Sequence, residues 1–225
     1  DGYSSDGTYE ILKKLKKKWR IIKQSRLNGV YSNLNRASKY LKGDYIGLLH
    51  SDDIFYDKNV IKKIANKFKN KKINIIYTDI NIVKKNNLNF VIRNWIANEK
   101  KLSTVKNSEE YKILLKNGWM PAHTGFFFRK KLIKKFNYNI KYEISADYDL
   151  MIRMLKNIDG IYYLPIKSTK MRIGGKSSKI NKLFKKMNED LEVIKKNNLN
   201  GYSTLAKKIF SKLKQFYKKW EENYF

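Results

Sequence analysis

Two neighbouring aspartates at the end of an apolar run are the residues that most clearly indicate chemistry. In the stretch DYIGLLHSDDIFY, Asp52 and Asp53 directly follow residues typical of a buried strand. Adjacent carboxylates repel each other and each needs a partner, so packing alone seldom explains such a pair. The pair could form a turn in which one aspartate caps the next helix. Alternatively, it forms a site for a hard cation, Mg²⁺ or Mn²⁺, that carboxylate and phosphate oxygens share.

The two histidines of the chain both lie beside the expected end of a strand. His50 precedes the acidic pair in LLHSDD, and His123 follows Pro121 in MPAHTGFF. A structural hydrogen bond would explain either residue. Because both fall where a cleft is expected, His50 and His123 are also candidate metal ligands. His123 could in addition shape an acceptor pocket or contact a pyrophosphate.

A second acidic segment, SADYDLMIR, places Asp147 and Asp149 at the expected start of a helix. Acids in the first turn complement the helix dipole, which is the plain structural explanation. A carboxylate at a helix N-terminus facing a cleft also has what a general base needs. A general base needs a fixed position and must lie within hydrogen-bond distance of an incoming hydroxyl. Both interpretations stay open at this point.

Basic and aromatic candidates follow in two further segments. The run GGKSS at 174–178 lacks the full GxxxxGK[ST] spacing, so a P-loop for a nucleoside triphosphate is not predicted. Two explanations of this run are equally good: a plain turn, or a mobile loop that brings Arg172 and Lys176 toward an anionic substrate. Segment 80–125 is expected to hold acceptor contacts, with Arg93 and Trp95 as candidates.

Helical and strand-like patterns alternate along the chain. This alternation predicts an α/β fold, a mostly parallel sheet flanked by helices, with ligands at the carboxyl ends of its strands. Helices are expected over 9–19, 33–43, 59–68, 109–118 and 144–157, and strands over 20–25, 44–49, 73–79, 90–95, 124–130, 160–165 and 166–173. Thr8 or Asp6 would cap the first helix, and Gly43 would end the second.

Composition limits the possible classes of function. The net charge of +30 would attract phosphates, acidic polymers or an anionic membrane. Because lysines are spread along nearly every segment with abundant Asn and Ile, we favour compositional drift and expect no nucleic-acid partner. The absence of cysteine excludes disulfides and thiolate zinc sites, and it fits a reducing compartment. No apolar run approaches the roughly 20 residues that span a bilayer.

Beyond about residue 179 the chain changes to lysine-rich helices. We expect two parts, a first domain over 1–178 and a basic amphipathic helical extension over 179–225. In the last helix one side is apolar, and lysines lie largely on the other sides. The apolar residues are Leu205, Ile209, Leu213, Phe216 and Trp220. Such a helix could lie on an anionic leaflet, or its apolar side could pack on the domain.

The order of the motifs resembles one known family. DGYSSDGT, NGVYSNLNRASKYLKGDYIGLLHSDD, MPAHTGFFFRKKL, ISADYDLMIR and MRIGGKS follow each other as in bacterial family 2 glycosyltransferases of the GT-A fold. The sequence is most similar to the group that assembles capsule, O-antigen (lipopolysaccharide) or colanic-acid-type exopolysaccharide. The resemblance covers residues 1 to about 178.

The resemblance implies a role for each acid. Asp1 would contact the nucleotide base, Asp52 the ribose, and Asp53 the metal, while Asp147 would be the catalytic base. The expected reaction moves a sugar from a nucleoside-diphosphate sugar to an acceptor hydroxyl, with a divalent cation at the diphosphate. One base without a second carboxylate nucleophile predicts inversion at the anomeric carbon. The partners would be the donor, a glycan or lipid-linked acceptor, and the inner face of a bacterial cytoplasmic membrane.

The sequence departs from the family in two places. Many members have an aspartate where this chain has His50, two residues before the acidic pair. Members also begin with a strand, a helix and a second strand before the Asp-Gly-x-Ser segment, which starts here at Asp1. We therefore expect this 225-residue piece alone to be inactive or unstable; donor binding at full-length affinity would contradict that.

Two other classes of function remain open on sequence grounds. A non-catalytic basic module would bind nucleic acid or acidic polysaccharide with affinity that falls steeply with salt and ignores Asp52→Ala. A nucleotidyltransferase would also use paired acids with Mg²⁺. A metal-dependent release of nucleotide from a nucleotide sugar separates both from a glycosyltransferase.

Overall fold

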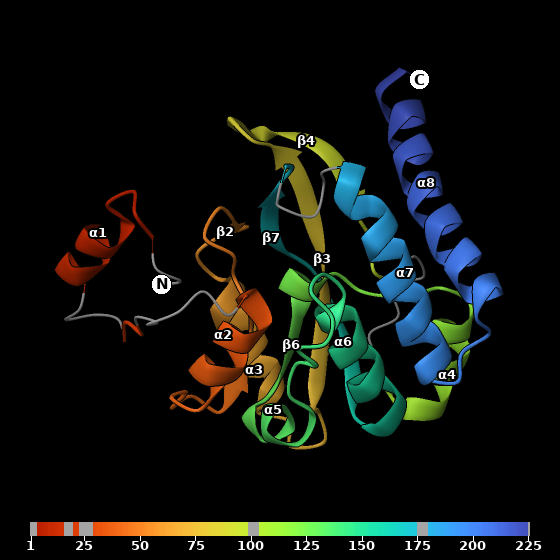
Figure 1. The fold of residues 1–225 in the computed structure, drawn as a ribbon, viewed down its shortest axis with the longest axis horizontal. Helices are drawn as coiled ribbons and strands as arrows, with labels where there is room; N and C mark the ends of the chain where they lie inside the picture. Colours follow the sequence, from red (N-terminus) through yellow and green to blue (C-terminus); the bar gives the residue numbers. More distant parts are fainter. Residues whose placement is uncertain (1–3, 16–19, 23–28, 99–103, 175–179, 225) are drawn as a thin grey trace.

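The computed structural model describes residues 4–15, 20–22, 29–98, 104–174 and 180–224. Its centre is a curled mixed sheet with helices packed against it (Figure 1). The strands are β1 (Tyr45–Ile46), β2 (Ile54–Phe55), β3 (Ile75–Lys84), β4 (Asn87–Trp95), β5 (Val105–Lys106), β6 (Phe126–Arg129) and β7 (Ile161–Arg172). The helices are α1 (Thr8–Lys14), α2 (Val30–Ser38), α3 (Val60–Phe68), α4 (Ser108–Lys116), α5 (Lys130–Phe136), α6 (Ala146–Asn157), α7 (Ile180–Lys196) and α8 (Tyr202–Tyr224), with the short 3₁₀ helix η1 (His123–Gly125).

The strand order confirms an α/β fold but corrects the expected strand directions. The strands are ordered β1-β6-β3-β7-β2, with β4 beside β3 and β5 beside β7. Within the described sheet β3 and β7 run parallel, and the five other pairings are antiparallel. The sheet is mixed, as expected, but the expectation that most of its strands run parallel was wrong. A two-residue connection joins β3 to β4, and so short a link can only form a hairpin.

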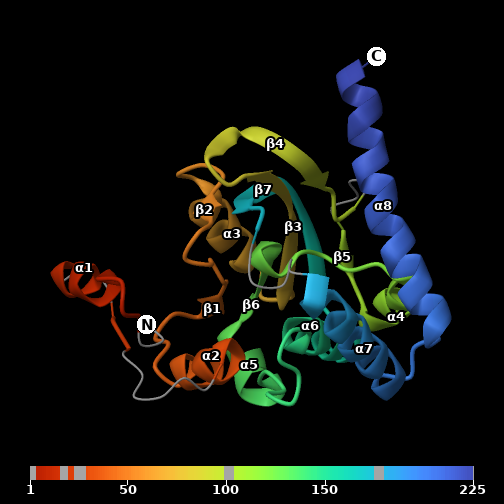
Figure 2. The same cartoon turned by 45° about the horizontal axis from the view of Figure 1, so that its top comes forward.

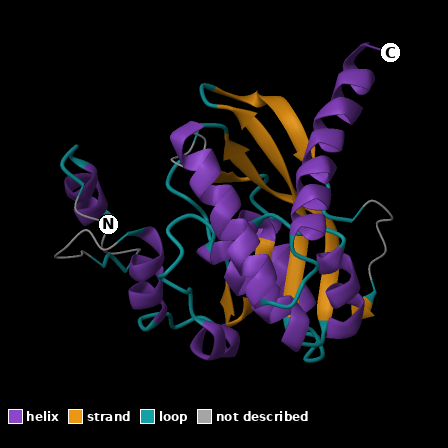
Figure 3. Ribbon diagram, turned by 45° about the vertical axis from the view of Figure 1, so that its right-hand side comes forward, coloured by secondary structure: helices purple, strands orange, loops and turns teal. Residues whose placement is uncertain are grey.

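The core lies on both faces of β3, β6 and β7. Successive side chains of a strand point to opposite faces, so Ile75 and Tyr77 enter one apolar cluster and Ile76 enters the other. The larger cluster includes buried residues of α4, α6, α7 and α8, and the smaller one is covered by α3. Figure 3 shows these helices around the strands. Burial on both faces explains the nearly continuous apolar sequence of β3.

The first 50 residues differ most from the sequence-based expectations. Residues 20–22 are not in a strand, and the rest of that expected strand lies outside the described residues. The expected buried strand over 44–49 is reduced to β1, which is half-buried and pairs only with β6 in the described sheet. Ile11 and Leu15 of the first helix are exposed, and α2 ends at Ser38, before Gly43. An apolar stripe is buried only where another element covers it, and α1 lies apart from the sheet (Figure 2).

Strand β7 is continuous where two strands were expected. Pro165 has an exposed side chain and lies where the register between β3 and β7 shifts, so the strand accommodates it as a local irregularity. The carboxyl end of β7 pairs with β2, a strand that the sequence patterns did not predict. Helix α5 and strand β5 were also not predicted. The pairing of β7 with β2 is what brings residue 172 to the acidic turn.

Helices α7 and α8 pack on the same core as the rest of the chain. Val193, Ile194, Leu199 and Leu205 belong to the larger apolar cluster. Gly118, at a φ of +75°, ends α4 against the backbone of α8, where an added Cβ would lie 2.4 Å from the amide nitrogen of Lys208. The far end of α8 extends beyond the sheet (Figure 2). In the described part of the chain no helix is both long and apolar enough to cross a membrane.

Candidate active site

Asp53 lies in a tight turn between β1 and β2. Its amide donates to the carbonyl of His50 at 3.1 Å, and its Oδ1 accepts from the amide of Arg172 at 3.1 Å. The residue is 6% exposed, and its Oδ2 is buried without a hydrogen-bond partner among the described residues. Burial and the neighbouring Asp52 raise the pKa of Asp53, opposed by the Arg172 amide and by His50. One oxygen of a desolvated carboxylate is thus left for an external partner.

Arg172 fastens this turn to the rest of the sheet. Its guanidinium donates to the carbonyl of Asp52 through Nη1, and to the carbonyl of Lys85 at 3.1 Å through Nε. The acidic turn, the β3–β4 turn and the end of β7 are therefore tied together by one side chain. The anion contact predicted for Arg172 stays a prediction. Asp1 and Lys176, the other expected contacts on this side, lie outside the described residues.

Asp147 lies in the first turn of α6 with a partly open carboxylate. Its side chain is 30% exposed, and its Oδ2 is 3.8 Å from Nδ1 of His123. His123 is buried, and its Nε2 is 3.0 Å from the hydroxyl of Tyr138. Burial lowers the pKa of His123, with His50 acting in the same direction and Asp147 against it. The imidazole is therefore mainly neutral near pH 7, and at 3.8 Å it lies beyond hydrogen-bond distance of the carboxylate.

The two histidines occupy the space between the two acids. The rings of His50 and His123 meet edge to face with centroids 6.3 Å apart. His50 belongs to the turn of Asp53, while His123 contacts Asp147. The structure thus brings the sequence-predicted residues of both segments into one continuous site.

Two tyrosines that the sequence patterns did not single out border Asp147. Tyr31 of α2 stacks on Tyr138 at 5.4 Å between ring centroids and donates to the carbonyl of Ile144 at 2.8 Å. Burial and the charge of Asp147 raise the pKa of both hydroxyls. Nothing in a lone tyrosine at position 31 or 138 marks it in the sequence, because the contact spans more than 100 residues of chain.

Asp149, two residues after Asp147, has a structural environment. It is fully buried, and its Oδ2 accepts from Nε of Arg153 at 2.8 Å and from Nη2 at 2.7 Å. Arg153 also donates to the carbonyl of Phe136. A carboxylate held in this way cannot reach a substrate, which leaves Asp147 as the chemically available acid of α6.

The acceptor candidates Arg93 and Trp95 lie on β4 beside α8. The guanidinium carbon of Arg93 is 4.9 Å from the ring centroid of Trp95, and Arg93 is buried. Lys212 of α8 reaches the same ring at 5.7 Å. The helical pattern puts Lys208 and Lys212 off the apolar side of the last helix, yet Lys208 is buried and Lys212 is half-buried. Both lose exposure because β4 and α6 cover their side of α8.

A divalent cation would find few protein ligands in the described ranges. No three His, Asp or Glu side chains gather there in a metal-binding group. The buried, unpartnered Oδ2 of Asp53 nevertheless has the chemistry of a ligand for a hard cation. A cation at this position would take its remaining ligands from water and from phosphate oxygens, as is usual for Mg²⁺ at nucleotide sites.

A mixed, curled sheet flanked by helices, with acids at a strand end and at a helix start, defines the GT-A class of glycosyltransferase folds. The chain belongs to glycosyl transferase family 2, whose family model matches residues 1–136. An uncharacterized glycosyltransferase, MJ1057 of Methanocaldococcus jannaschii, is 28% identical over 151 residues. That match covers 66% of this chain and 49% of the relative, so the chain spans about half the length of the curated relative it matches.

Solved structures share the fold at low sequence identity. S. aureus TarS 1–349 in complex with UDP-GlcNAc has a TM-score of 0.64 at 15% identity, covering 93% of this chain and 61% of that chain. The mannosyltransferase PcManGT from Pyrobaculum calidifontis, in complex with GDP-Man and Mn²⁺, has a TM-score of 0.55 at 11% identity. It covers 87% of this chain and 52% of that chain. At these identities the likeness concerns the fold.

Proposed function

We propose that this protein transfers a sugar, with inversion, from a nucleoside-diphosphate sugar to a hydroxyl of a growing surface glycan. The observation that carries the proposal is the pairing of two unlike carboxylates in one site. Asp53 is desolvated with one oxygen unpartnered, and Asp147 is partly open beside a neutral His123. Family 2 membership supplies the class of reaction.

Asp147 acts as the general base. Its carboxylate takes the proton of the acceptor hydroxyl as that oxygen attacks the anomeric carbon and the bond to the diphosphate breaks. The neighbouring carboxylate that could act as a nucleophile, Asp149, is held by Arg153 inside the protein. A single available base favours direct displacement, and hence inversion.

Asp53 and Asp52 hold the donor end. Oδ2 of Asp53 is the proposed oxygen for a divalent cation, and the exposed Asp52 is the proposed contact for the ribose. When bound, the cation would neutralise charge on the diphosphate leaving group. The donors bound to the structural neighbours, UDP-GlcNAc and GDP-Man, are the first two nucleotide sugars to test.

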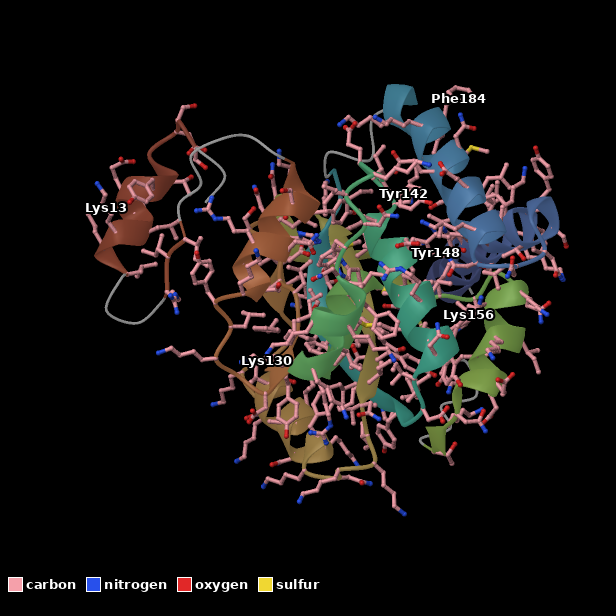
Figure 4. The ribbon with its side chains drawn as sticks, turned by 60° about the horizontal axis from the view of Figure 1, so that its bottom comes forward. Lys13, Lys130, Tyr142, Tyr148, Lys156 and Phe184 are labelled. Atoms are coloured by element: carbon pink, nitrogen blue, oxygen red, sulfur yellow. The ribbon has the colours of Figure 1, made fainter. Side chains whose placement is uncertain are left out.

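Exposed apolar side chains beside lysines support contact with an anionic membrane surface. Phe184 near the start of α7 is 72% exposed (Figure 4), and Phe210 of α8 is 70% exposed. Leu183 and Leu213 are exposed on the same two helices. Apolar residues of this kind could enter the headgroup region while lysines attract anionic lipid. We place the protein at the inner face of a bacterial cytoplasmic membrane, where lipid-linked acceptors would be present.

The direct test, made on the full-length protein that contains these residues, is release of nucleotide from UDP-GlcNAc and GDP-Man with Mn²⁺, with Mg²⁺ and with EDTA. We expect metal-dependent release by the wild type and loss of release in Asp53→Asn. Asp57→Asn is the matched control, because Asp57 is an exposed acid just after β2 that pairs with Lys63. If Asp53→Asn and Asp57→Asn release nucleotide at the same rate, the proposed metal and donor site is wrong. Configuration of the product, read by NMR of the anomeric proton, tests inversion.

A further inference from the structure

A group of cations lies beside the first turn of α6, the turn that carries Asp147. Lys186 of α7 and Lys208 of α8 share the buried Asp190, at 3.4 Å from Oδ1 and 2.8 Å from Oδ2. Asp190 also accepts from the hydroxyl of Ser145 at 2.8 Å. Ser145 is the residue before α6, so this network is fastened two residues from Asp147.

Lys208 connects this network to the first turn of α6. Its ammonium lies 3.2 Å from the ring centroid of Tyr148, the residue that follows Asp147. Tyr148 lies on α6 beside α7 and α8 (Figure 4). Asp190 carries one negative charge, so it does not neutralise both ammonium groups, those of Lys186 and Lys208.

Lys212 extends the group one helical turn further, toward β4. Its ammonium contacts the ring of Trp95, and among the described residues it makes no hydrogen bond and no ion pair. Arg93 contacts the same ring, so two cations share one indole. Partly buried ammonium groups normally have a carboxylate or phosphate partner, because losing water without one is unfavourable.

Burial first, and this crowding second, lower the pKa of the two lysines of α8. Burial, together with the charges of Lys186 and Arg93, lowers the pKa of Lys212 to about 8, while Asp190 and Asp147 act in the opposite direction. Burial and the charges of Lys186 and Lys212 lower the pKa of Lys208 to about 7, and Asp190 opposes them. An added anion would relieve this repulsion and keep both ammonium groups charged.

We propose that Lys212, with Arg93 and Lys186, binds an anionic group of the acceptor, a phosphate or a carboxylate, close to the hydroxyl that Asp147 deprotonates. The inference rests on the proposed function, since it assigns the acceptor side of that site. It makes the acceptor a charged glycan and not a neutral one. The donor diphosphate is a less suitable ligand for these cations. It is assigned to the turn of Asp53, which lies at the other end of the candidate site, beyond His50 and His123.

The test compares three small sugars: methyl glucoside, which is neutral, and glucose 6-phosphate and glucuronate, which carry a phosphate and a carboxylate. Binding is followed by the indole N–H signal of Trp95, assigned with Trp95→Phe, because this ring contacts both Lys212 and Arg93. We expect at least one of the two anionic sugars to bind more tightly than methyl glucoside. The stronger of the two identifies phosphate or carboxylate as the preferred group.

Variants then locate the binding. Lys212→Gln should lower the affinity for the preferred anionic sugar about ten-fold, as expected for loss of one charged contact. Lys212→Arg should keep that affinity within about three-fold of wild type. Lys207→Gln is the matched control, since Lys207 is exposed on the same helix and donates to Asn117. Thermal unfolding of each variant separates loss of binding from loss of fold.

Three results would overturn the inference. These are equal binding of charged and neutral sugars, an anion preference that survives in Lys212→Gln, and an equal loss of UDP or GDP binding in Lys212→Gln, which would assign the cations to the donor. Failure of the proposed function has a different signature. It would appear as absence of metal-dependent nucleotide release in the wild type, a measurement that does not involve Lys212.

Discussion

The two ends of the candidate site hold their acids by different means. Asp53 is fixed by main-chain groups, because its Oδ1 accepts from the amide of Arg172 and its own amide donates to His50. Asp147 also has a main-chain contact, from the amide of Tyr148 to its Oδ1 at 2.8 Å, but its Oδ2 is bordered by side chains, with His123 at 3.8 Å and Tyr31 and Tyr138 nearby. Main-chain contacts tolerate changes in neighbouring side chains, whereas the surroundings of Oδ2 of Asp147 depend on their identity.

The difference fits two different tasks. A ligand for a cation has only to present one oxygen in a fixed place, and a backbone turn provides that. A base has to accept and release a proton, so its surroundings must set its pKa and its orientation. Within α6 the contrast is repeated on a smaller scale, because Asp149 is buried with Arg153 while Asp147 stays partly open.

The largest expected effect is on catalysis at the Asp147 end. Asp147→Asn should lower sugar transfer by about 100- to 10,000-fold, because an amide cannot accept the proton, while donor binding stays within about two-fold. Transfer rate and donor affinity are measured on the same preparation. Glu143→Gln, a change of an exposed acid that pairs with Lys182 and Lys185, is the control. Residual transfer above a tenth of wild type would remove Asp147 from the role of base.

The next effect tests whether Asp149 is structural. Arg153→Met should lower the free energy of unfolding by about 3 kcal/mol, because a buried carboxylate is left without its partner. Urea unfolding measures this. Lys63→Met, which removes an exposed ion pair with Asp57, should change it by less than about 1 kcal/mol. Similar values for both variants would contradict the assignment.

At the Asp53 end we expect a gain in stability. The raised pKa of Asp53 means that the folded state binds its proton more tightly than the unfolded state, so the ionised carboxylate destabilises the fold at neutral pH. Asp53→Asn should therefore stabilise by about 1 kcal/mol near pH 7.

The advantage of Asp53→Asn over wild type should shrink as pH falls through the raised pKa. There the wild type gains stability by protonation of Asp53 and the variant does not. Unfolding in urea at several pH values checks both parts. A variant that is less stable than wild type at pH 7 would show that the turn depends on the charge.

The smallest effect concerns His123. Its pKa is lowered in the folded state, so the unfolded imidazole takes up a proton first as pH falls below about 6.5, and wild-type stability declines there. His123→Gln should remove this part of the decline, at most about 1.4 kcal/mol per pH unit. His50→Gln, at an exposed position, is the comparison. Parallel pH profiles for wild type and His123→Gln would contradict a buried neutral imidazole.

Several elements could be predicted because their patterns are local. Helices α3, α4 and α6 and strands β3 and β4 were expected from periodicity and end signals, and the structure confirms them. Strands β2 and β5 have two residues each and carry no readable period. Ile61 of α3 is apolar but exposed, because only one side of that helix contacts the sheet.

The site was predicted in part, for a similar reason. The sequence marked both acidic pairs and both histidines, since residue types and strand-end positions are local signals. Residue type and spacing alone could not distinguish Asp147 from Asp149, which only the family resemblance did, because Arg153 and the network around His123 decide which of the two is buried. The sequence did not reveal the burial of Lys208 and Lys212, since helical spacing says nothing about which faces β4 and α6 will cover.

By itself, the sequence determined the class of fold, the positions of the acids along it and the charge of the chain, because these depend on residue types and their spacing. Only the tertiary structure decided the strand directions, the separate environments of Asp53, Asp147 and Asp149, and the cations gathered near the base. Those features arise from contacts between residues far apart in the chain. Burial then changes the energies of charged groups in ways that no local pattern encodes.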